Sequence, residues 1–382
     1  MTRKFFLAVA WLTMTVSVSA QTTAEAIMAL LPKLPTEAEM IRYQKETSAP
    51  QHLNISVTQP DLYNDFYDAL KVANEKANTK MEKVGESVKA KTMNSKAAGT
   101  DYTVSQVQGM NQSQQEAMVQ QALAKKLGSV GLSMSDLANL QNGEISEAQA
   151  QAMASKMVSQ MTGGLTMQDI QAMEKMTDKQ RAEYMQKSGK GQAVSAKIAK
   201  DKPNLDRQKQ QYELSQKILD CGKRELALQN KMTNKYTEAT KAGKELYNRE
   251  YKARIDACEA TMQQAIKEGA FSEKYSEADR PKVMAAGKKY NAANEQAWQI
   301  MCDFYARYIP MWRNTVLSCM NMCKSDYLSL MNEMKTVTDD LYSLTQDAGY
   351  ANGDIYPPRA GLAYLEQSEK LEGYTRVLEE EE

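Results

Sequence analysis

Residues 211–246, QYELSQKILDCGKRELALQNKMTNKYTEATKAGKEL, space apolar side chains three or four positions apart within a polar segment. The apolar positions are Leu214, Ile218, Cys221, Leu228, Met232, Ala239, Ala242 and Leu246. This spacing gathers them on one face of an α-helix. Proline is absent between residues 204 and 268, so the sequence predicts long helical structure throughout this tract. The apolar phase slips after Leu246 and resumes at Tyr251.

A second tract, residues 281–347, continues the same pattern with more aromatic side chains. Its stripe keeps phase through Pro310, which predicts a kink in one helix rather than a turn between two. An aromatic cluster surrounds that proline and is expected to close the core there. The cluster consists of Trp298, Phe304, Tyr305, Tyr308 and Trp312. An exposed aromatic platform for a glycan or a protein partner is the alternative.

The two tracts are expected to pair as one long antiparallel hairpin, residues 204–347, around a polar loop bracketed by Gly269 and Pro281. In that pairing Cys221 lies opposite position 328. A fold-back of the first tract at Ala242-Gly243 is the alternative, but a single glycine is a weak helix stop.

The N-terminal and C-terminal segments of the chain are expected to contain shorter elements than the hairpin. Residues 21–103 are expected to form two short helices, one helix over 61–91 that joins the bundle, and a linker. Residues 348–382, with two adjacent prolines and four terminal glutamates, are expected to form a flexible acidic tail.

Residues 104–203 are rich in Met, Gln and Ala and carry a degenerate duplication with an offset of about 33 residues. Gly131 to Leu140 aligns with Gly164 to Met173, and Ile145 to Gln149 with Met176 to Gln180. Ser146 and Thr177 are each followed three positions later by a glutamine, which fits the capping-box pattern. Ser133 and Thr166 each place a hydroxyl cap before an acidic first turn. The segment is therefore expected to be an inserted Met-rich helical subdomain.

The N-terminus predicts export. Arg3 and Lys4 precede an apolar run of about 14 residues that ends in small residues at Ala20, which is typical of a signal peptide. We expect cleavage after Ala20 and a periplasmic or extracellular protein, without membrane insertion after cleavage. The 48 basic and 48 acidic side chains cancel, and this balance argues against a nucleic-acid partner.

Five cysteines in an exported chain are disulfide candidates, and an odd number leaves one free. They are Cys221, Cys258, Cys302, Cys319 and Cys323. We expect at least one bridge. Cys221 would pair with Cys323 or Cys319 in the long hairpin, and with Cys258 in the fold-back. The alternative is that all five cysteines are small, unpaired core residues.

Catalytic patterns are absent from the sequence. A single histidine, His52, sits between Pro50 and Pro60 and is expected at the surface. The sharper chemical hypothesis is Cu(I) binding by thioethers of Met153, Met157 and Met161, which recur at four-residue spacing. The same spacing is typical of methionines that fill a helical core, the reading we favour. No catalytic residue and no cofactor are predicted.

The sequence thus predicts an all-α protein: an elongated, coiled-coil-like bundle of antiparallel long helices with an inserted Met-rich helical subdomain. The expected function is that of an exported, non-catalytic scaffold or interaction protein of a bacterial cell envelope. Its partner would be an envelope protein or a second copy. A Met-rich periplasmic Cu(I)-binding protein is the first alternative, and an envelope-polymer hydrolase is the second.

Overall fold

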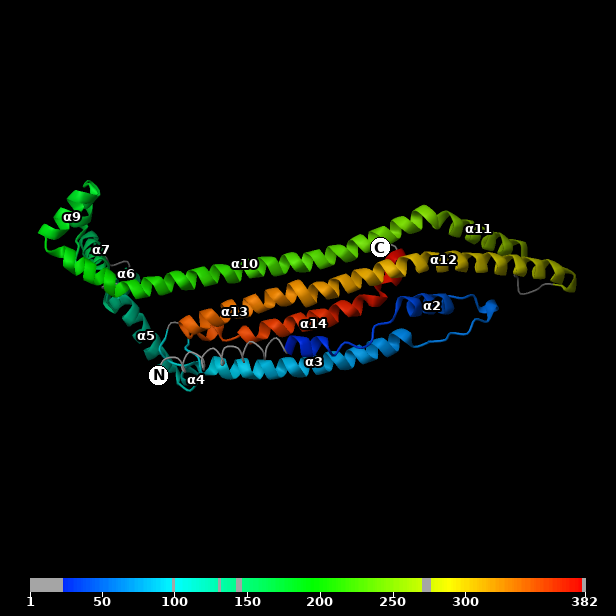
Figure 1. Ribbon diagram of the computed structural model, residues 1–382, viewed down its shortest axis with the longest axis horizontal. Coiled ribbons are helices and arrows are strands. Elements are labelled where there is room, and N and C mark those ends of the chain that lie inside the picture. The colour runs from blue at the N-terminus through cyan, green and yellow to red at the C-terminus, as the bar shows by residue number, and fades with distance from the viewer. Residues whose placement is uncertain (1–22, 98–99, 130–131, 142–145, 270–275, 380–382) are drawn as a thin grey trace, which may run out of the picture. The chain divides into compact units, whose positions relative to one another are not determined.

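A computed structural model of the chain describes residues 23–97, 100–129, 132–141, 146–269 and 276–379 (Figure 1). The described part is nearly all helical and contains no β-strand, which confirms the all-α prediction. Within the same ranges, no helix is both long enough and apolar enough to span a bilayer. The predicted signal peptide, residues 1–20, lies outside the described residues.

The chain divides into two compact units, which are described separately. Unit 1 comprises Met1–Glu86, Asp220–Lys335 and Asp354–Glu382. Unit 2 comprises Ser87–Leu219 and Thr336–Gly353. The division falls inside three helices: α3 (Leu62–Met93), α10 (Lys190–Glu250) and α13 (Leu328–Thr345).

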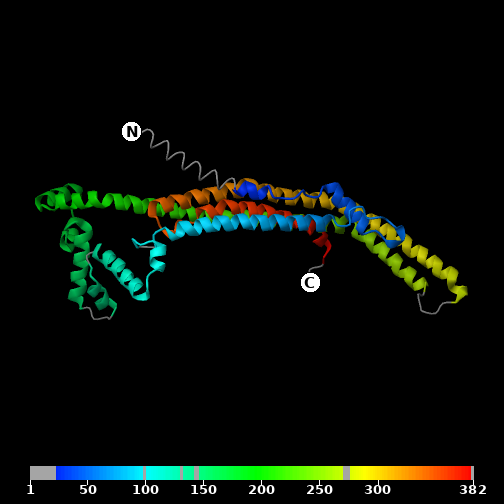
Figure 2. The same ribbon diagram turned by 90° about the horizontal axis from the view of Figure 1, so that it is seen from below.

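In unit 1, the second half of α10 and helix α11 (Lys252–Gly269) run antiparallel to α12 (Arg280–Met322). Glu268 pairs with Lys289 at 3.0 Å, and Glu250 pairs with Arg307 farther from the loop. Residue numbers therefore increase along one helix as they decrease along the other, as in an antiparallel pair. Figures 1 and 2 show α11 and α12 side by side. The junction of α10 and α11 falls at Tyr251, where the apolar phase of the sequence slips.

Gly243 lies inside α10, so the alternative fold-back at Ala242-Gly243 is wrong. A Cβ at this position would lie 2.3 Å from Cε2 of Tyr308 and 2.7 Å from Cγ2 of Val377. The glycine thus permits close approach of the α10 backbone to a buried ring instead of ending the helix.

Helix α12 continues through Pro310, as the unbroken stripe predicts. Phe304, Tyr308 and Trp312 are buried around that proline, and the Phe304 and Tyr308 rings stack with centroids 5.6 Å apart. These three rings form core, not the exposed platform that was the alternative. The partly buried Trp298 donates its indole N–H to the Lys45 carbonyl at 3.0 Å.

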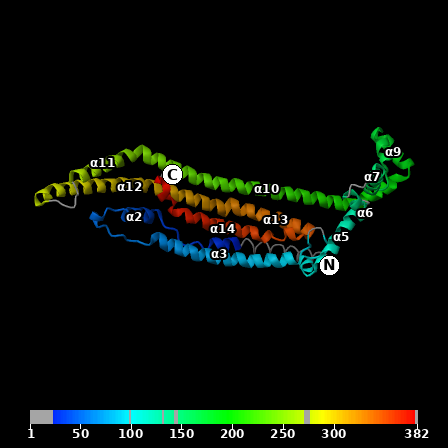
Figure 3. The ribbon, with the colours of Figure 1, turned by 180° about the vertical axis from the view of Figure 1, so that it is seen from behind.

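The N-terminal segment of unit 1 contributes residues 23–28, which are helical, and α2 (Glu37–Thr47). Thr36 and Glu39 form a capping box that starts α2, and Met40 packs into the core. Figure 3 shows α2 beside α12, consistent with their many residue contacts.

The C-terminal segment is not the flexible tail that the sequence predicted. Pro357 and Pro358 occupy the first turn of α14 (Tyr356–Ser368), where a missing N–H costs nothing. A 3₁₀ segment, η6 (Glu369–Leu378), follows. Its Leu371, Tyr374 and Val377 are buried in the unit 1 core. Only the last three glutamates lie outside the described residues.

Unit 2 holds the Met-rich segment as a series of short helices. They are α4 (Val104–Gln108), α5 (Gln112–Ser129), α6 (Met134–Gln141), α7 (Glu147–Thr162), α8 (Met167–Glu174) and α9 (Asp178–Lys187). The capping boxes predicted at Ser146 and Thr177 are formed, and the hydroxyl cap predicted at Thr166 also forms a box with Asp169. Pro203, the predicted end of this segment, lies inside α10 and terminates no helix.

The α8 cap is also a tertiary junction within unit 2. The Asp169 carboxylate is buried and accepts hydrogen bonds from the Tyr184 hydroxyl and the Lys190 ammonium, both at 2.6 Å. Thr166 adds its backbone N–H and hydroxyl, each at 2.7 Å. One carboxylate thus ties together α8, α9 and the start of α10. Elsewhere in the unit, Leu214 packs with Val337 and Leu341 in a separate small cluster.

Candidate functional site

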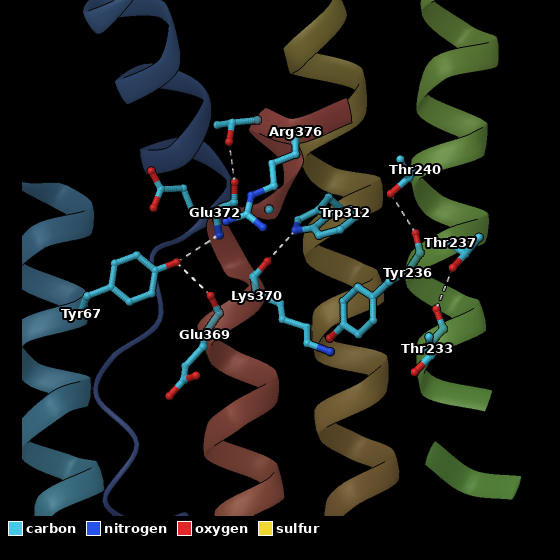
Figure 4. Close-up of a pocket in the computed structure, with 12 residues that line it drawn as sticks. Tyr67, Thr233, Tyr236, Thr237, Thr240, Trp312, Glu369, Lys370, Glu372 and Arg376 are labelled. Atoms are coloured by element: carbon cyan, nitrogen blue, oxygen red, sulfur yellow. Dashed lines mark hydrogen bonds between the residues drawn. The ribbon is translucent and has the colours of Figure 1, made fainter. Parts of the chain in front are cut away.

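A cavity of about 670 Å³ opens in unit 1 where α3, α10, α12 and η6 meet (Figure 4). Helix α10 lines it with three threonines, at 233, 237 and 240, which share a face because they are spaced three or four residues apart. The aromatic residues Tyr67, Tyr236 and Trp312 also line it, and residues of η6 complete the wall.

The polar ends of these rings are already engaged by the C-terminal segment. The Tyr67 hydroxyl donates to the Glu369 carbonyl at 3.0 Å, and the Trp312 indole N–H donates to the Lys370 carbonyl at 2.8 Å (Figure 4). The Tyr236 hydroxyl donates to the Gln367 side chain at 3.0 Å. The cavity wall is therefore fixed by the segment that the sequence predicted to be flexible, and the cavity presents ring surfaces.

The chemistry available in this cavity suits binding. Burial raises the pKa of Tyr67 to about 12 and raises that of Tyr236 further. Both phenols therefore stay protonated near neutral pH and cannot serve as general bases there. The Lys370 ammonium lies 4.4 Å from the Tyr236 ring centroid, a cation–π contact. Such a surface can hold a partner that carries both apolar and polar groups.

A second candidate site is an exposed apolar face of α10 in unit 2. Leu205, Tyr212 and Leu219 are 58 %, 66 % and 58 % exposed. They are spaced seven residues apart, and seven residues turn a helix to within about 20° of its starting direction. The three large side chains therefore share one solvent-facing strip. We name this set the α10 strip.

Sequence reasoning missed the α10 strip because it followed the buried stripe of the same helix. Residues three and four positions from each member of the strip are mostly polar or charged. At that spacing the strip therefore resembles a solvated helix face. The signal that could have revealed it is the seven-residue period, which continues in the sequence at Leu226. That leucine is 59 % exposed within unit 1.

The methionines of the Cu(I) hypothesis all belong to α7. Met153 is buried and Met157 is partly buried. The Met161 side chain lies outside the described residues, so the trio stays a prediction. Their setting in a small helical segment is compatible with the favoured interpretation, in which these methionines fill a helical core.

The predicted disulfide is wrong, because all five cysteines are free thiols. Cys221 lies in a buried cluster with Tyr327 and Leu328, close to the position that antiparallel pairing assigns to it. Cys323 instead faces Met232. Met232 is eleven residues beyond Cys221 on α10, about 16 Å along the axis, which is too far for a bridge.

Continuity of α10 also excludes the fold-back pair, Cys221 with Cys258. Cys302 is only partly buried, while Cys258, Cys319 and Cys323 are buried. The burial of four of the five thiols therefore favours the alternative in which the cysteines are small core residues.

The remaining chemistry-bearing residue, His52, is exposed in the short 3₁₀ turn η1 (Gln51–Leu53), as predicted. Across the described ranges, no three His, Cys, Asp or Glu side chains cluster closely enough to hold a metal ion. Comparisons with protein-family models, with curated proteins and with solved structures find no match for this chain.

Proposed function

We propose that the chain is an exported, non-catalytic helical protein of a bacterial cell envelope that acts as a scaffold or interaction partner. The observation that carries this proposal is the α10 strip. Large apolar side chains that share one exposed face of a helix offer a surface to which a partner can bind. A helix of 61 residues offers such a strip as an extended contact line rather than a pocket.

The occupant that best fits the strip is another helix. Apolar residues repeated every seven positions are the pattern that packs along a left-handed supercoil, since a partner helix can follow the same period. The residues that flank the strip are polar, including Lys209 and Gln216. A polar flank of this kind restricts the contact to the apolar line and keeps the free protein in solution.

The arrangement proposed for the whole chain is an elongated bundle built on the hairpin 204–347, with residues 104–203 as an inserted Met-rich subdomain. Support comes from contacts inside each unit. In unit 1, Tyr327 donates to Glu225 at 2.7 Å and Arg307 pairs with Glu250. In unit 2, Leu214 packs with Val337. All three pairs follow a similar antiparallel register.

Export is proposed from residues 1–20 of the sequence alone. A basic start, a short apolar run and small residues before Gln21 match what a signal peptidase accepts. Comparing the N-terminal residue of the protein recovered from cells with Gln21 tests this part of the proposal directly.

The interaction is tested with a photo-crosslinking amino acid placed at Tyr212 in living cells. The matched control places it at Gln210, which is exposed on the same helix but is rotated away from the strip. We expect adducts from position 212 and few from position 210. An adduct with a second copy indicates a self-assembling scaffold, whereas an adduct with an envelope protein indicates an interaction partner. Equal labelling from both positions, or none from 212, contradicts the proposal.

A further inference from the structure

Two cysteines contact one methionine in the core of unit 1. The Cys323 thiol contacts the Met232 thioether, with 3.6 Å between Sγ and Sδ. The Cys319 thiol points at the backbone carbonyl of the same Met232, at 3.8 Å. Cys319 and Cys323 are completely buried, and Met232 is 7 % exposed. Two cysteines from α12 and its extension thus face one methionine from α10.

The backbone changes its hydrogen-bonding pattern at this point. Residues Cys323–Tyr327 form a π-helical turn, η3, between α12 and α13. Such turns insert an extra residue into a helix, cost stability and occur frequently at functional sites. Here the turn begins at one of the two thiols, so the helix is remodelled where the sulfurs meet.

We propose that Cys319, Cys323 and Met232 form a binding site for one Cu(I) ion. Two thiolates and a thioether are soft ligands, which favour Cu(I) over Mg²⁺ or Ca²⁺. A set of three ligands, one of them a thioether, also fits Cu(I) better than the four-coordinate sites of structural Zn²⁺. The spacing also fits: metal–sulfur bonds of about 2.3 Å in a tetrahedral site place sulfurs about 3.8 Å apart. The observed separation of 3.6 Å between the Cys323 and Met232 sulfurs therefore needs little rearrangement.

Binding exchanges protons for the metal. A cysteine binds a metal as its thiolate, so each of the two buried thiols must lose its proton on binding. Cu(I) replaces the two thiol protons, which pass to solvent, and no electron is transferred. The bound centre then carries one net negative charge. Glu366 disfavours the thiolate of Cys323, whereas the ammonium of Lys370 favours the thiolate of either cysteine.

An approach for the ion exists on the Met232 side. A second cavity in unit 1, of about 380 Å³, is lined by Met232 together with Tyr327, Glu366 and Lys370. The methionine therefore separates this cavity from the two buried thiols. A thioether at that position can meet the ion first and pass it inward to the thiolates.

The competing explanation is ordinary core packing, in which sulfur contacts only fill space. The two explanations differ in their response to Met232→Leu. Leucine conserves volume, so packing is retained with little loss of stability. It removes the thioether, so Cu(I) affinity must fall. This site goes beyond the proposed interaction function, since the α10 strip requires no metal.

The experiment is an anaerobic Cu(I) titration of the reduced full chain from Gln21, in competition with the chromophoric chelator bicinchoninate. We expect one Cu(I) per chain, with an ultraviolet thiolate-to-copper charge-transfer band. Met232→Leu should weaken binding by at least about tenfold, a loss comparable to that seen when a residue supporting a metal site is removed. Cys323→Ser should weaken it more. Circular dichroism confirms that each variant is folded.

Cys258→Ser is the matched control, because this thiol is also buried in unit 1 but lies on α11. It should bind like the parent chain, and so should Met153→Leu in unit 2. X-ray absorption of the loaded protein should show a sulfur-only first shell. The proposal is overturned if the chelator keeps all the copper. It is also overturned if Met232→Leu and Cys323→Ser bind like the parent, or if Cys258→Ser weakens binding as much as they do.

Discussion

Gly243→Ala should destabilise unit 1, although alanine is the better helix former. In an open helix interior the change would stabilise the protein by about 1 kcal/mol. At this position the new methyl group would lie 2.3 Å from Cε2 of Tyr308 and 2.7 Å from Cγ2 of Val377. Tyr308 cannot move aside, since its ring is fully buried between Phe304 and Trp312.

The size of the effect follows from two opposing contributions. Overpacking of a well-filled core costs about 1–3 kcal/mol, and a contact this short with a fixed ring belongs at the upper end. Subtracting the helix-propensity gain of about 1 kcal/mol leaves a net loss of about 2 kcal/mol. Gly222→Ala is the matched control in the same helix, because nothing lies within 4 Å of its added methyl group. It should stabilise the protein by up to about 1 kcal/mol.

Urea unfolding followed by tryptophan fluorescence measures both variants. In a chain that begins at Gln21 the only tryptophans are Trp298 and Trp312, and both belong to unit 1. Val377→Ala should recover part of the loss in the Gly243→Ala background, because it removes one of the two clashing groups. If Gly243→Ala is neutral or stabilising while Gly222→Ala behaves as expected, the close approach of α10 to Tyr308 is refuted.

Three further predictions concern the C-terminal segment, the unit 2 junction and the thiols. Tyr374→Ala should cost about 3–5 kcal/mol in the same urea assay, because a fully buried ring is lost; a cost below 1 kcal/mol would restore the flexible-tail model. The Lys190 ammonium holds the pKa of Asp169 well below its ordinary 3.8. The contact therefore stabilises unit 2 at neutral pH, and this stabilisation is lost progressively as the pH falls below 3.8. Hydrogen exchange of α8 and α9 should therefore quicken at low pH beyond the intrinsic change, and Asp169→Asn should be fast throughout; equal protection in both proteins would exclude the contact. Ellman's reagent should count five thiols in the denatured, unreduced chain, with Cys302 reacting first in the native one, whereas a count of three would establish a disulfide.

The sequence was most informative where the structure is local. Helix propensity, proline-free tracts and apolar spacing depend on residues within one or two turns, and these signals predicted the all-α class. Capping boxes at Ser146, Thr166 and Thr177 are also local, since the hydroxyl and its partner are three residues apart. The slip of the apolar phase likewise marked the helix junction at Tyr251.

Errors arose where one residue type can serve two purposes. Pro357 and Pro358 belong to the segment predicted as a flexible tail, yet in the first turn they start α14. Gly243 was considered as a turn, whereas it provides space for a ring from another helix. Pro203 ends the predicted Met-rich segment, yet it lies inside α10. Tertiary packing decides between such alternatives, and the local pattern around each residue is the same for both.

The sulfur cluster shows why a candidate site can escape a search along the chain. The predicted methionine ligands recur at four-residue spacing on one helix, whereas this cluster joins Met232 to cysteines 87 and 91 positions away in the sequence. Its formation depends on the register of α10 against α12. A slip of one residue would move Met232 by about 1.5 Å along the axis and turn it by about 100°, away from both thiols. The ion pair of Glu250 with Arg307 and the hydrogen bond of Tyr327 to Glu225 flank the cluster and hold that register. Sulfur ligands in this fold are therefore positioned by the pairing of the long helices, so the pairing must be known before such a site can be found.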